Sequence, residues 1–327
     1  MSGRPFVPVI HGAAADRPDE ADTRAAAEAV AQALADIGCA TEIMHLDFDL
    51  GVLEALGRRR PDAVFNLVEA LRGDCALALM VPLMLDNLGL RYTGAGAAAW
   101  ATTLSKTGTK RHLAAAGLPT PAWVEAGTAN RLPGRVIVKS DTEHASLGID
   151  AASVTSGAGA AAEIGRRERR HGGRFFAESF IEGREFNLSL IEEAGSPRVL
   201  PPAEIEFIDF PPERPHIVDY EAKWLAGSFA YDHTPRRFDF PATDHPLLER
   251  LCALALECWT LFGLTGYARV DFRVDGAGQP WILEVNLNPC LTPDAGFFAA
   301  ASRAGLDYPA MVRLILDAAL AARRQAA

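Results

Sequence analysis

Two short segments near the C-terminus carry oxygen-bearing side chains at a spacing that suits metal-ion chemistry. "PWILEVNLNP" presents Glu284 and Asn286 two residues apart, and "YARVDFRVDGAG" presents Asp271. Both segments alternate apolar and polar residues with a period of two, which predicts two strands, and "DGAG" predicts the turn between them. A turn centred in "DGAG" places Asp271 opposite Glu284. The opposite face is expected to meet the core through Val270, Phe272, Val274, Leu283 and Val285.

This hairpin brings two carboxylates together, and they repel each other unless a cation or a proton lies between them. Asp, Glu and Asn supply hard oxygen ligands, and neither segment contains histidine, so the natural ion is Mg²⁺ shared with substrate phosphates. The competing interpretation is a solvated strand face with Arg269 and Arg273 as counter-charges. The hairpin alone does not separate the two interpretations.

The rest of the chain must position this hairpin, and its pattern changes twice. Short apolar runs alternate with helical patterns over residues 1–95, which predicts a small parallel sheet whose first helix is capped by Asp22 or Thr23. Residues 96–182 read as a compact α+β unit. Residues 183–327 carry longer antiparallel strands and two final helices. The proline-rich "FIDFPPERPHIVDYEAKW" is the longest irregular stretch, and such loops are usually functional or mobile.

Composition excludes several classes of function. The chain has 327 residues and a formal net charge of −10, which argues against a general affinity for nucleic acid or anionic membranes. Its five cysteines form no CxxC pair, so they suggest neither a zinc site nor a disulfide framework, and a reducing compartment fits best. Without a signal peptide or a sufficiently long apolar run, the protein is expected to be cytoplasmic.

Several motifs resemble those of one enzyme superfamily. "RVDF" followed by "ILEVNLNP" closely resembles the metal-binding hairpin of the ATP-grasp superfamily, and "LTPDAGFFAAASRAGLDYPAMVRLILDAAL" resembles the end of its D-alanine:D-alanine ligase branch. "VIVKS" resembles the first nucleotide lysine strand and "VDYEAKW" the mobile-loop lysine. The resemblance implies a mixed α/β and α+β protein, with an ATP-grasp fold behind a small Rossmann-like N-terminal domain. It also implies a carboxylate–amine ligase that works through an acyl phosphate.

The resemblance carries roles to individual residues. It implies that Asp271, Glu284 and Asn286 bind magnesium, with Glu284 bridging two ions, and that Arg269 stabilises charge at the reacting carbonyl. Lys223 is implied both in catalysis and in contact with the terminal phosphates. The other implied ATP contacts are Lys106, Lys139, Ser146, Glu178, Phe180, Ile181, Glu185 and Leu283. The implied contacts with amino-acid-like substrates are Asp16, Glu69, Trp224 and Asp294.

The sequence differs from the family's motifs mainly at residues that are implied to contact the two substrates. Ala145 stands where the family has a serine, and Glu69 replaces a histidine. After "NLNP", Ala295 and Gly296 replace the turn that holds the second amino acid's carboxylate, with Asp294 beside them. An added acid disfavours a free carboxylate, so we expect an acceptor other than D-alanine.

Two alternatives remain open: a genuine D-alanine:D-alanine ligase, and an ATP-binding protein without catalysis. Cys290 is expected to be a small buried thiol with no base beside it. The resemblance also implies a homodimer through the N-terminal domains, which the alanine- and leucine-rich early helices permit.

Overall fold

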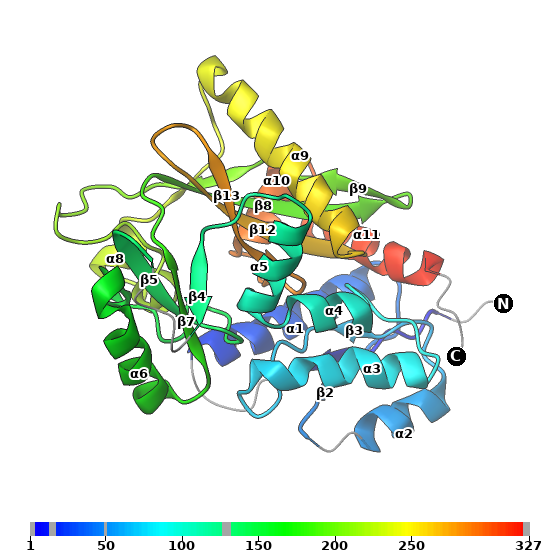
Figure 1. Ribbon diagram of the computed structural model, residues 1–327. Helices are drawn as coiled ribbons and strands as arrows, with labels where there is room; N and C mark the ends of the chain where they lie inside the picture. The colour runs from blue at the N-terminus through cyan, green and yellow to red at the C-terminus, as the bar shows by residue number, and fades with distance from the viewer. Residues whose placement is uncertain (1–3, 13–17, 49–50, 126–131, 323–327) are drawn as a thin grey trace.

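The computed structural model describes residues 4–12, 18–48, 51–125 and 132–322. It contains three sheets: the N-terminal unit lies at the lower right of Figure 1, the central sheet at the left, and the largest sheet above and between them. No helix in these ranges is long and apolar enough to cross a membrane.

The N-terminal unit contains the predicted parallel sheet, with strand order β2-β1-β3. Its elements are β1 (Val9–His11), α1 (Pro18–Asp36), β2 (Ile43–His45), α2 (Gly51–Arg59), β3 (Phe65–Asn66), the 3₁₀ helix η1 (Cys75–Leu79) and α3 (Met80–Asn87). Because α1 begins at Pro18, Asp22 and Thr23 lie inside the helix and do not cap it, so that prediction was wrong.

The central sheet is antiparallel, in the order β4-β7-β5-β6. Its strands are β4 (Trp123–Glu125), β5 (Arg135–Ser140), β6 (Val154–Ser156) and β7 (Phe175–Ser179), joined by the 3₁₀ helices η3 (Ala151–Ser153) and η4 (Gly157–Gly159) and by α6 (Ala160–His171). Ile164 of α6 packs in one small core with Val136, Val138 and Ala177. The other side of this sheet faces the large sheet and supplies one wall of the site described below.

The large sheet runs in the order β11-β10-β8-β12-β13, with β9 also paired to β8, and all its pairs are antiparallel, as predicted for this part of the chain. Its strands are β8 (Arg184–Glu193), β9 (Ser196–Val199), β10 (Ala203–Ile205), β11 (Arg236–Arg237), β12 (Tyr267–Val274) and β13 (Pro280–Asn286). Two short helices, α7 (Tyr220–Trp224) and α8 (Phe229–Asp232), interrupt the long irregular stretch before β11.

The two faces of the large sheet have opposite character because side chains alternate along each strand. Phe186 and Leu188 of β8 and Val270 and Phe272 of β12 are fully buried on one face. The other face carries Glu185, Asn187, Arg269, Asp271 and Arg273. The polar face therefore crosses two neighbouring strands and is continuous.

Helices cover the apolar face and the far end of the polar one. The helix α9 (His245–Leu261), which the sequence analysis did not identify, packs on the apolar face together with α4 (Ala97–Thr103) and α5 (Lys106–Ala115). The two predicted final helices are α10 (Gly296–Arg303) and α11 (Tyr308–Ala321), and α11 packs against α1. The 3₁₀ helix η5 (Ala242–Asp244) precedes α9.

The cores of the predicted domains are shared. One cluster of buried residues joins α1 to α10 and α11, and α4 and α5 pack on the large sheet although residues 96–182 were expected to form a separate unit. The division into 1–95, 96–182 and 183–327 stays a prediction.

A glycine fixes the connection between the central and large sheets, immediately before β8. Gly183 has φ +138°, and a Cβ there would lie 2.1 Å from the Val274 carbonyl oxygen.

We expect Gly183→Ala to lower the free energy of unfolding by about 2 kcal/mol, because the alanine adds both backbone strain and a steric clash with that oxygen. Chemical denaturation of this variant beside Gly276→Ala checks the expectation. A Cβ at Gly276 meets nothing within 4 Å, so the control should stay near wild type.

Candidate functional site

The hairpin β12–β13 places the two predicted carboxylates face to face. Asp271 pairs directly with Glu284, and Arg269 with Asn286, which confirms the predicted register. The register then shifts between Asp271 and Phe272, so that Phe272 pairs with Ile282 and one residue of β13 is extra.

This β-bulge changes which side chains face the site. Ile282 and Val285 are buried in the core, whereas Leu283 and Glu284 are both turned away from it. The expectation that Leu283 faces the core was therefore wrong. Leu283 instead lines the cavity that also holds Lys139 and Glu178. A bulge allows two consecutive residues to point to one side of a strand, which regular alternation forbids.

Asp271 is buried and held by two neighbours on the polar face. Arg269 donates to both of its carboxylate oxygens, at 2.7 and 2.9 Å, and the Asn187 amide donates to one of them at 2.8 Å. Burial alone would lower the pKa of Arg269, but the ion pair with Asp271 outweighs it and the pKa lies above its usual value. Arg269 is thus the counter-charge of Asp271, on a face that is buried rather than solvated.

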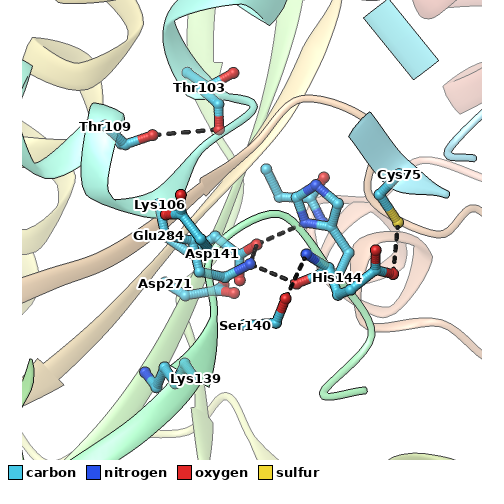
Figure 2. Close-up of polar contacts among 12 residues, drawn as sticks. Cys75, Thr103, Lys106, Thr109, Lys139, Ser140, Asp141, His144, Asp271 and Glu284 are labelled. Atoms are coloured by element: carbon cyan, nitrogen blue, oxygen red, sulfur yellow. Dashed lines mark hydrogen bonds and ion pairs between the residues drawn. The ribbon is translucent and has the colours of Figure 1, made fainter. Parts of the chain in front are cut away.

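Glu284 is contacted by the Lys106 ammonium and the His144 ring, which come from distant segments, as Figure 2 shows. The His144 ring nitrogen Nδ1 lies 2.8 Å from Glu284 Oε1, and Lys106 Nζ lies 3.6 Å from the same oxygen. Burial alone would raise the pKa of Glu284, but Lys106 and His144 outweigh it and hold the pKa well below its usual value. The sequence analysis predicted Lys106 and missed His144.

The loop after β5 brings these groups together. Asp141 accepts hydrogen bonds from the Ser105 hydroxyl and from the Thr107 backbone N–H, so the loop docks on the first turn of α5. Lys106, the first residue of α5, donates to the Glu143 carbonyl oxygen at 2.6 Å. Because the loop and the helix start are tied together in this way, His144 and Lys106 reach Glu284 from the same side.

A second charged group links the central sheet to the hairpin. Glu178 of β7 is almost fully buried and pairs with Lys139 and with Lys110, each at 2.6 Å. Lys110 also donates to the Thr120 hydroxyl, which donates to the Ile282 carbonyl oxygen beside the bulge. Lys139 and Glu178 were predicted, whereas Lys110 was missed although it lies one helical turn after Lys106.

The predicted ATP contacts line one cavity of about 100 Å³. Its walls include Lys106, Lys139, Ser146, Glu178, Phe180, Ile181, Glu185, Lys223 and Leu283. Ligand pockets usually measure roughly 300–1,000 Å³, so this cavity is narrow.

Two loops that line this cavity are in contact with each other. The Ser146 hydroxyl donates to the Val218 carbonyl oxygen at 2.8 Å, and the Trp224 indole donates to the Ala145 carbonyl oxygen at 2.9 Å. Ala145 and Ser146 both have left-handed backbone angles, φ +59° and +58°. The segment that carries Lys223 therefore lies as a cover on the loop that carries His144.

A larger cavity of about 440 Å³ adjoins the first and shares with it Lys223, Asp271 and Glu284. The predicted substrate residues Glu69, Trp224 and Asp294 line it, as do Arg269 and Asn286. The predicted substrate residue Asp16 lies outside the described residues. Burial and the nearby Arg269 lower the pKa of Lys223, against the opposing effect of Glu284 and Asp271.

Three further groups in this cavity were not predicted as site residues: Asp22, Arg236 and Cys290. Cys290 Sγ lies 2.8 Å from Asp22 Oδ2, so a carboxylate does stand beside this thiol, contrary to expectation. Burial and the Asp22 charge raise the pKa of Cys290, which keeps the thiol protonated and unsuited to nucleophilic chemistry.

The donor set at the hairpin suits a hard cation. Asp271, Glu284 and Asn286 offer only oxygen, and two of them are carboxylates in direct register, as Mg²⁺ prefers. Across residues 4–12, 18–48, 51–125 and 132–322, no three side chains drawn from His, Cys, Asp and Glu already converge to hold a metal ion. The set therefore needs further oxygens, such as those of phosphates or water.

Comparison with known proteins gives consistent matches. A family model described as "D-ala D-ala ligase C-terminus" matches residues 116–317. The D-alanine–D-alanine ligase of Moorella thermoacetica is 31% identical over 312 residues, covering 89% of this chain and 92% of that protein. The enzyme of the same name from Synechococcus sp. (strain JA-2-3B'a(2-13)) is 32% identical, covering 90% and 87%.

Solved structures agree at the level of the fold. The D-alanine–D-alanine ligase of Bacillus anthracis, in complex with ATP, has a TM-score of 0.76 at 19% identity and covers 97% of each chain. The ligase of Coxiella burnetii has a TM-score of 0.70 at 17% identity, covering 98% of this chain and 94% of that one. The predicted ATP-grasp fold with a preceding N-terminal α/β unit is confirmed.

The buried group of Lys110, Glu178 and Lys139 yields a test of stability. We expect Lys110→Met to lower the free energy of unfolding by about 3 kcal/mol, because it leaves a fully buried carboxylate with one counter-charge in place of two. Urea unfolding at pH 7 measures this, with Arg111→Met as control, whose partner Glu125 is exposed. If both variants lose equally little stability, Lys110 contributes no more to the free energy of unfolding than a surface cation such as Arg111.

The same group predicts a pH dependence. Burial alone would raise the pKa of Glu178, but Lys110 and Lys139 outweigh it, and the pKa lies below its usual 4.5. The unfolded chain takes up a proton near pH 4.5, whereas the folded carboxylate does so only at lower pH. This part of the stability is therefore present above pH 4.5 and lost as the pH falls below it. The pH-dependent loss should be smaller in Lys110→Met.

Proposed function

This chain belongs to the D-alanine–D-alanine ligase family, and we propose that it joins two D-alanine molecules at the expense of ATP. The observation that carries the proposal is the shared wall of the two cavities. Lys223, Asp271 and Glu284 line both the cavity of the predicted ATP contacts and the cavity of the predicted substrate contacts. A phosphoryl group held in the first therefore borders a carboxylate held in the second.

The choice of D-alanine revises the expectation drawn from the sequence, which favoured another acceptor. The relatives that match over most of the chain are named D-alanine–D-alanine ligases, so the alternative reading has the better support. An acceptor other than D-alanine stays a second candidate on one observation: Asp294 and Ala295 line the substrate cavity beside Gly296.

In the proposed reaction the terminal phosphoryl group of ATP passes to the carboxylate of the first D-alanine. The amine of the second D-alanine then attacks the acyl phosphate, and phosphate leaves. Each step builds negative charge at one place, next to Arg269 and Lys223. Fixed cations stabilise that charge without rearranging, which is the main source of catalysis in such reactions.

Most of the proposed phosphate contacts are occupied by the protein's own carboxylates. Lys139 pairs with Glu178, and Lys106 lies near Glu284. Phosphates carry more negative charge and more acceptor oxygens than one carboxylate, so they can take over both lysines. Because Lys110 stays on Glu178, releasing Lys139 does not strand a buried carboxylate.

Asp271, Glu284 and Asn286 would hold Mg²⁺. Bound there, Mg²⁺ would neutralise phosphate charge and orient the transferring group. The same carboxylates have partners within the protein: Arg269 pairs with Asp271, and His144 and Lys106 lie beside Glu284.

The cover formed by α7 has a proposed role in protecting the intermediate. An acyl phosphate hydrolyses in water, and a closed cover excludes water. The contacts of Ser146 with Val218 and of Trp224 with Ala145 must open for the nucleotide to enter the small cavity, and they can reform over it.

The first substrate's ammonium group has acidic partners. Glu69 and Asp22, both from the N-terminal unit, line the substrate cavity. We assign the ammonium group to these two acids. A homodimer, a cytoplasmic location and the three-domain division stay proposals of the sequence analysis.

Phosphate release tests the proposed reaction. With ATP and Mg²⁺, D-alanine should stimulate release by at least tenfold, and mass spectrometry should detect the dipeptide. A panel of L-amino acids, β-amino acids, hydroxy acids and amines serves for comparison. Stimulation by a member of the panel without stimulation by D-alanine would favour the second candidate.

The metal ligands give a separate test. We expect Glu284→Gln to abolish turnover, because a neutral amide is a weaker ligand for Mg²⁺ than a carboxylate. The fold should survive, as judged by circular dichroism, and so should most of the affinity for ATP. Glu193→Gln, at the exposed end of β8, is the control. Full activity in Glu284→Gln would sink the metal assignment.

A further inference from the structure

The unpredicted residue Arg236 lines the proposed substrate cavity. It belongs to the two-residue strand β11, at the edge of the large sheet. Its neighbour Arg237 points to the other side, where it pairs with Glu204 and Glu206. The alternation of side chains along a strand turns Arg236 the opposite way, and it lines the cavity together with Arg269 and Asp294.

The side chain of Arg236 is held in place by the turn after "NLNP". Its Nη1 donates to the Asp294 carbonyl oxygen at 3.1 Å. A Cβ at position 296 would lie 3.1 Å from Arg236 Nε and 3.6 Å from its Cδ, so glycine leaves the space that the arginine uses. The same turn that brings Asp294 to the cavity thus also positions a guanidinium there.

The charges around Arg236 call for an anion. Arg269 is already paired with Asp271, whereas in the described part of the chain no carboxylate lies within ion-pair distance of Arg236. The Arg236 side chain is solvent-exposed, and the charges of Arg269 and Asp294 act on it with opposite signs. A bound carboxylate near the two guanidinium groups would relieve their repulsion, and Arg236 offers the planar, two-pronged donor that carboxylates fit.

We propose that Arg236 binds the free carboxylate of the acceptor amino acid and thereby selects acceptors that have one. The inference rests on the proposed ligase function and deepens it. It also resolves a conflict in the sequence, where Asp294 alone argued against a carboxylate at this end of the cavity. With Arg236 anchored beside it, the negative charge of Asp294 is offset.

A competition between two acceptors tests this assignment. The full-length enzyme is given ATP, Mg²⁺ and a fixed mixture of D-alanine and D-alaninamide, which lacks the carboxylate and can react only as acceptor. Mass spectrometry gives the ratio of D-alanyl-D-alanine to D-alanyl-D-alaninamide. Because both products share the donor step, their ratio reports the acceptor preference alone.

We expect Arg236→Gln to lower the product ratio about 10- to 100-fold, the range for a lost hydrogen bond to a charged group. The rate with D-alaninamide and the KM for ATP should stay within about twofold of wild type. Arg236→Lys keeps the positive charge but loses the two-pronged guanidinium, so its product ratio should lie between those of the wild type and Arg236→Gln. Arg303→Gln is the control, since its guanidinium pairs with exposed Asp239 on the surface.

The outcomes separate the two proposals. An unchanged product ratio in Arg236→Gln overturns the assignment of Arg236 and leaves the ligase function standing. Equal losses with both acceptors indicate a merely structural role and overturn it as well. If the wild type and Arg303→Gln form no D-alanine-dependent product, the proposed function itself fails, and the inference falls with it.

Discussion

The site is organised around the repulsion between Asp271 and Glu284, which face each other in register across one hairpin. Asp271 is buried and Glu284 is half-buried, and carboxylates that face each other in this way are unstable without nearby positive charge or hydrogen-bond donors. The chain supplies such partners from three segments: Arg269 on the same strand, Lys106 at the start of α5, and the His144 ring in the loop after β5. The placement of α5 and of that loop is therefore as much an electrostatic requirement as a packing one.

The large sheet meets this requirement by separating its two faces. Its apolar face is covered by α4, α5 and α9, which anchors the first turn of α5 near the hairpin. Its polar face carries Asn187 directly opposite Asp271 and Glu185 opposite Arg273. The bulge at Leu283 then turns two consecutive residues of β13 to the polar side. Leu283 lines the cavity of the predicted nucleotide contacts, while Glu284 faces Asp271 on the neighbouring strand.

Local pattern was sufficient for part of this arrangement. The turn "DGAG" and the alternation along both strands predicted the hairpin. The pairing of Asp271 with Glu284 also depends on the bulge, because the pairs nearer the turn are shifted by one residue relative to it. The bulge could not be read, since Leu283 fits a regular alternation equally well. Lys110, His144 and Arg236 could not be read either, because each acquires its role from a partner far away in the chain. Arg236 lies on a strand of two residues, which is too short to show any period.

The ligand-free arrangement has a consequence for how phosphates enter. Lys139 and Lys106 already hold carboxylates, so a phosphate that binds them exchanges one anionic partner for another and does not strip water from bare cations. Exchange leaves a carboxylate behind, and burial makes an unpaired one expensive. Lys110 offsets that cost for Glu178, since it stays with the carboxylate when Lys139 leaves. For Glu284 the proposed Mg²⁺ would take the place of Lys106. Lys110, which the sequence did not reveal, is thus the residue that would let Lys139 bind a phosphate.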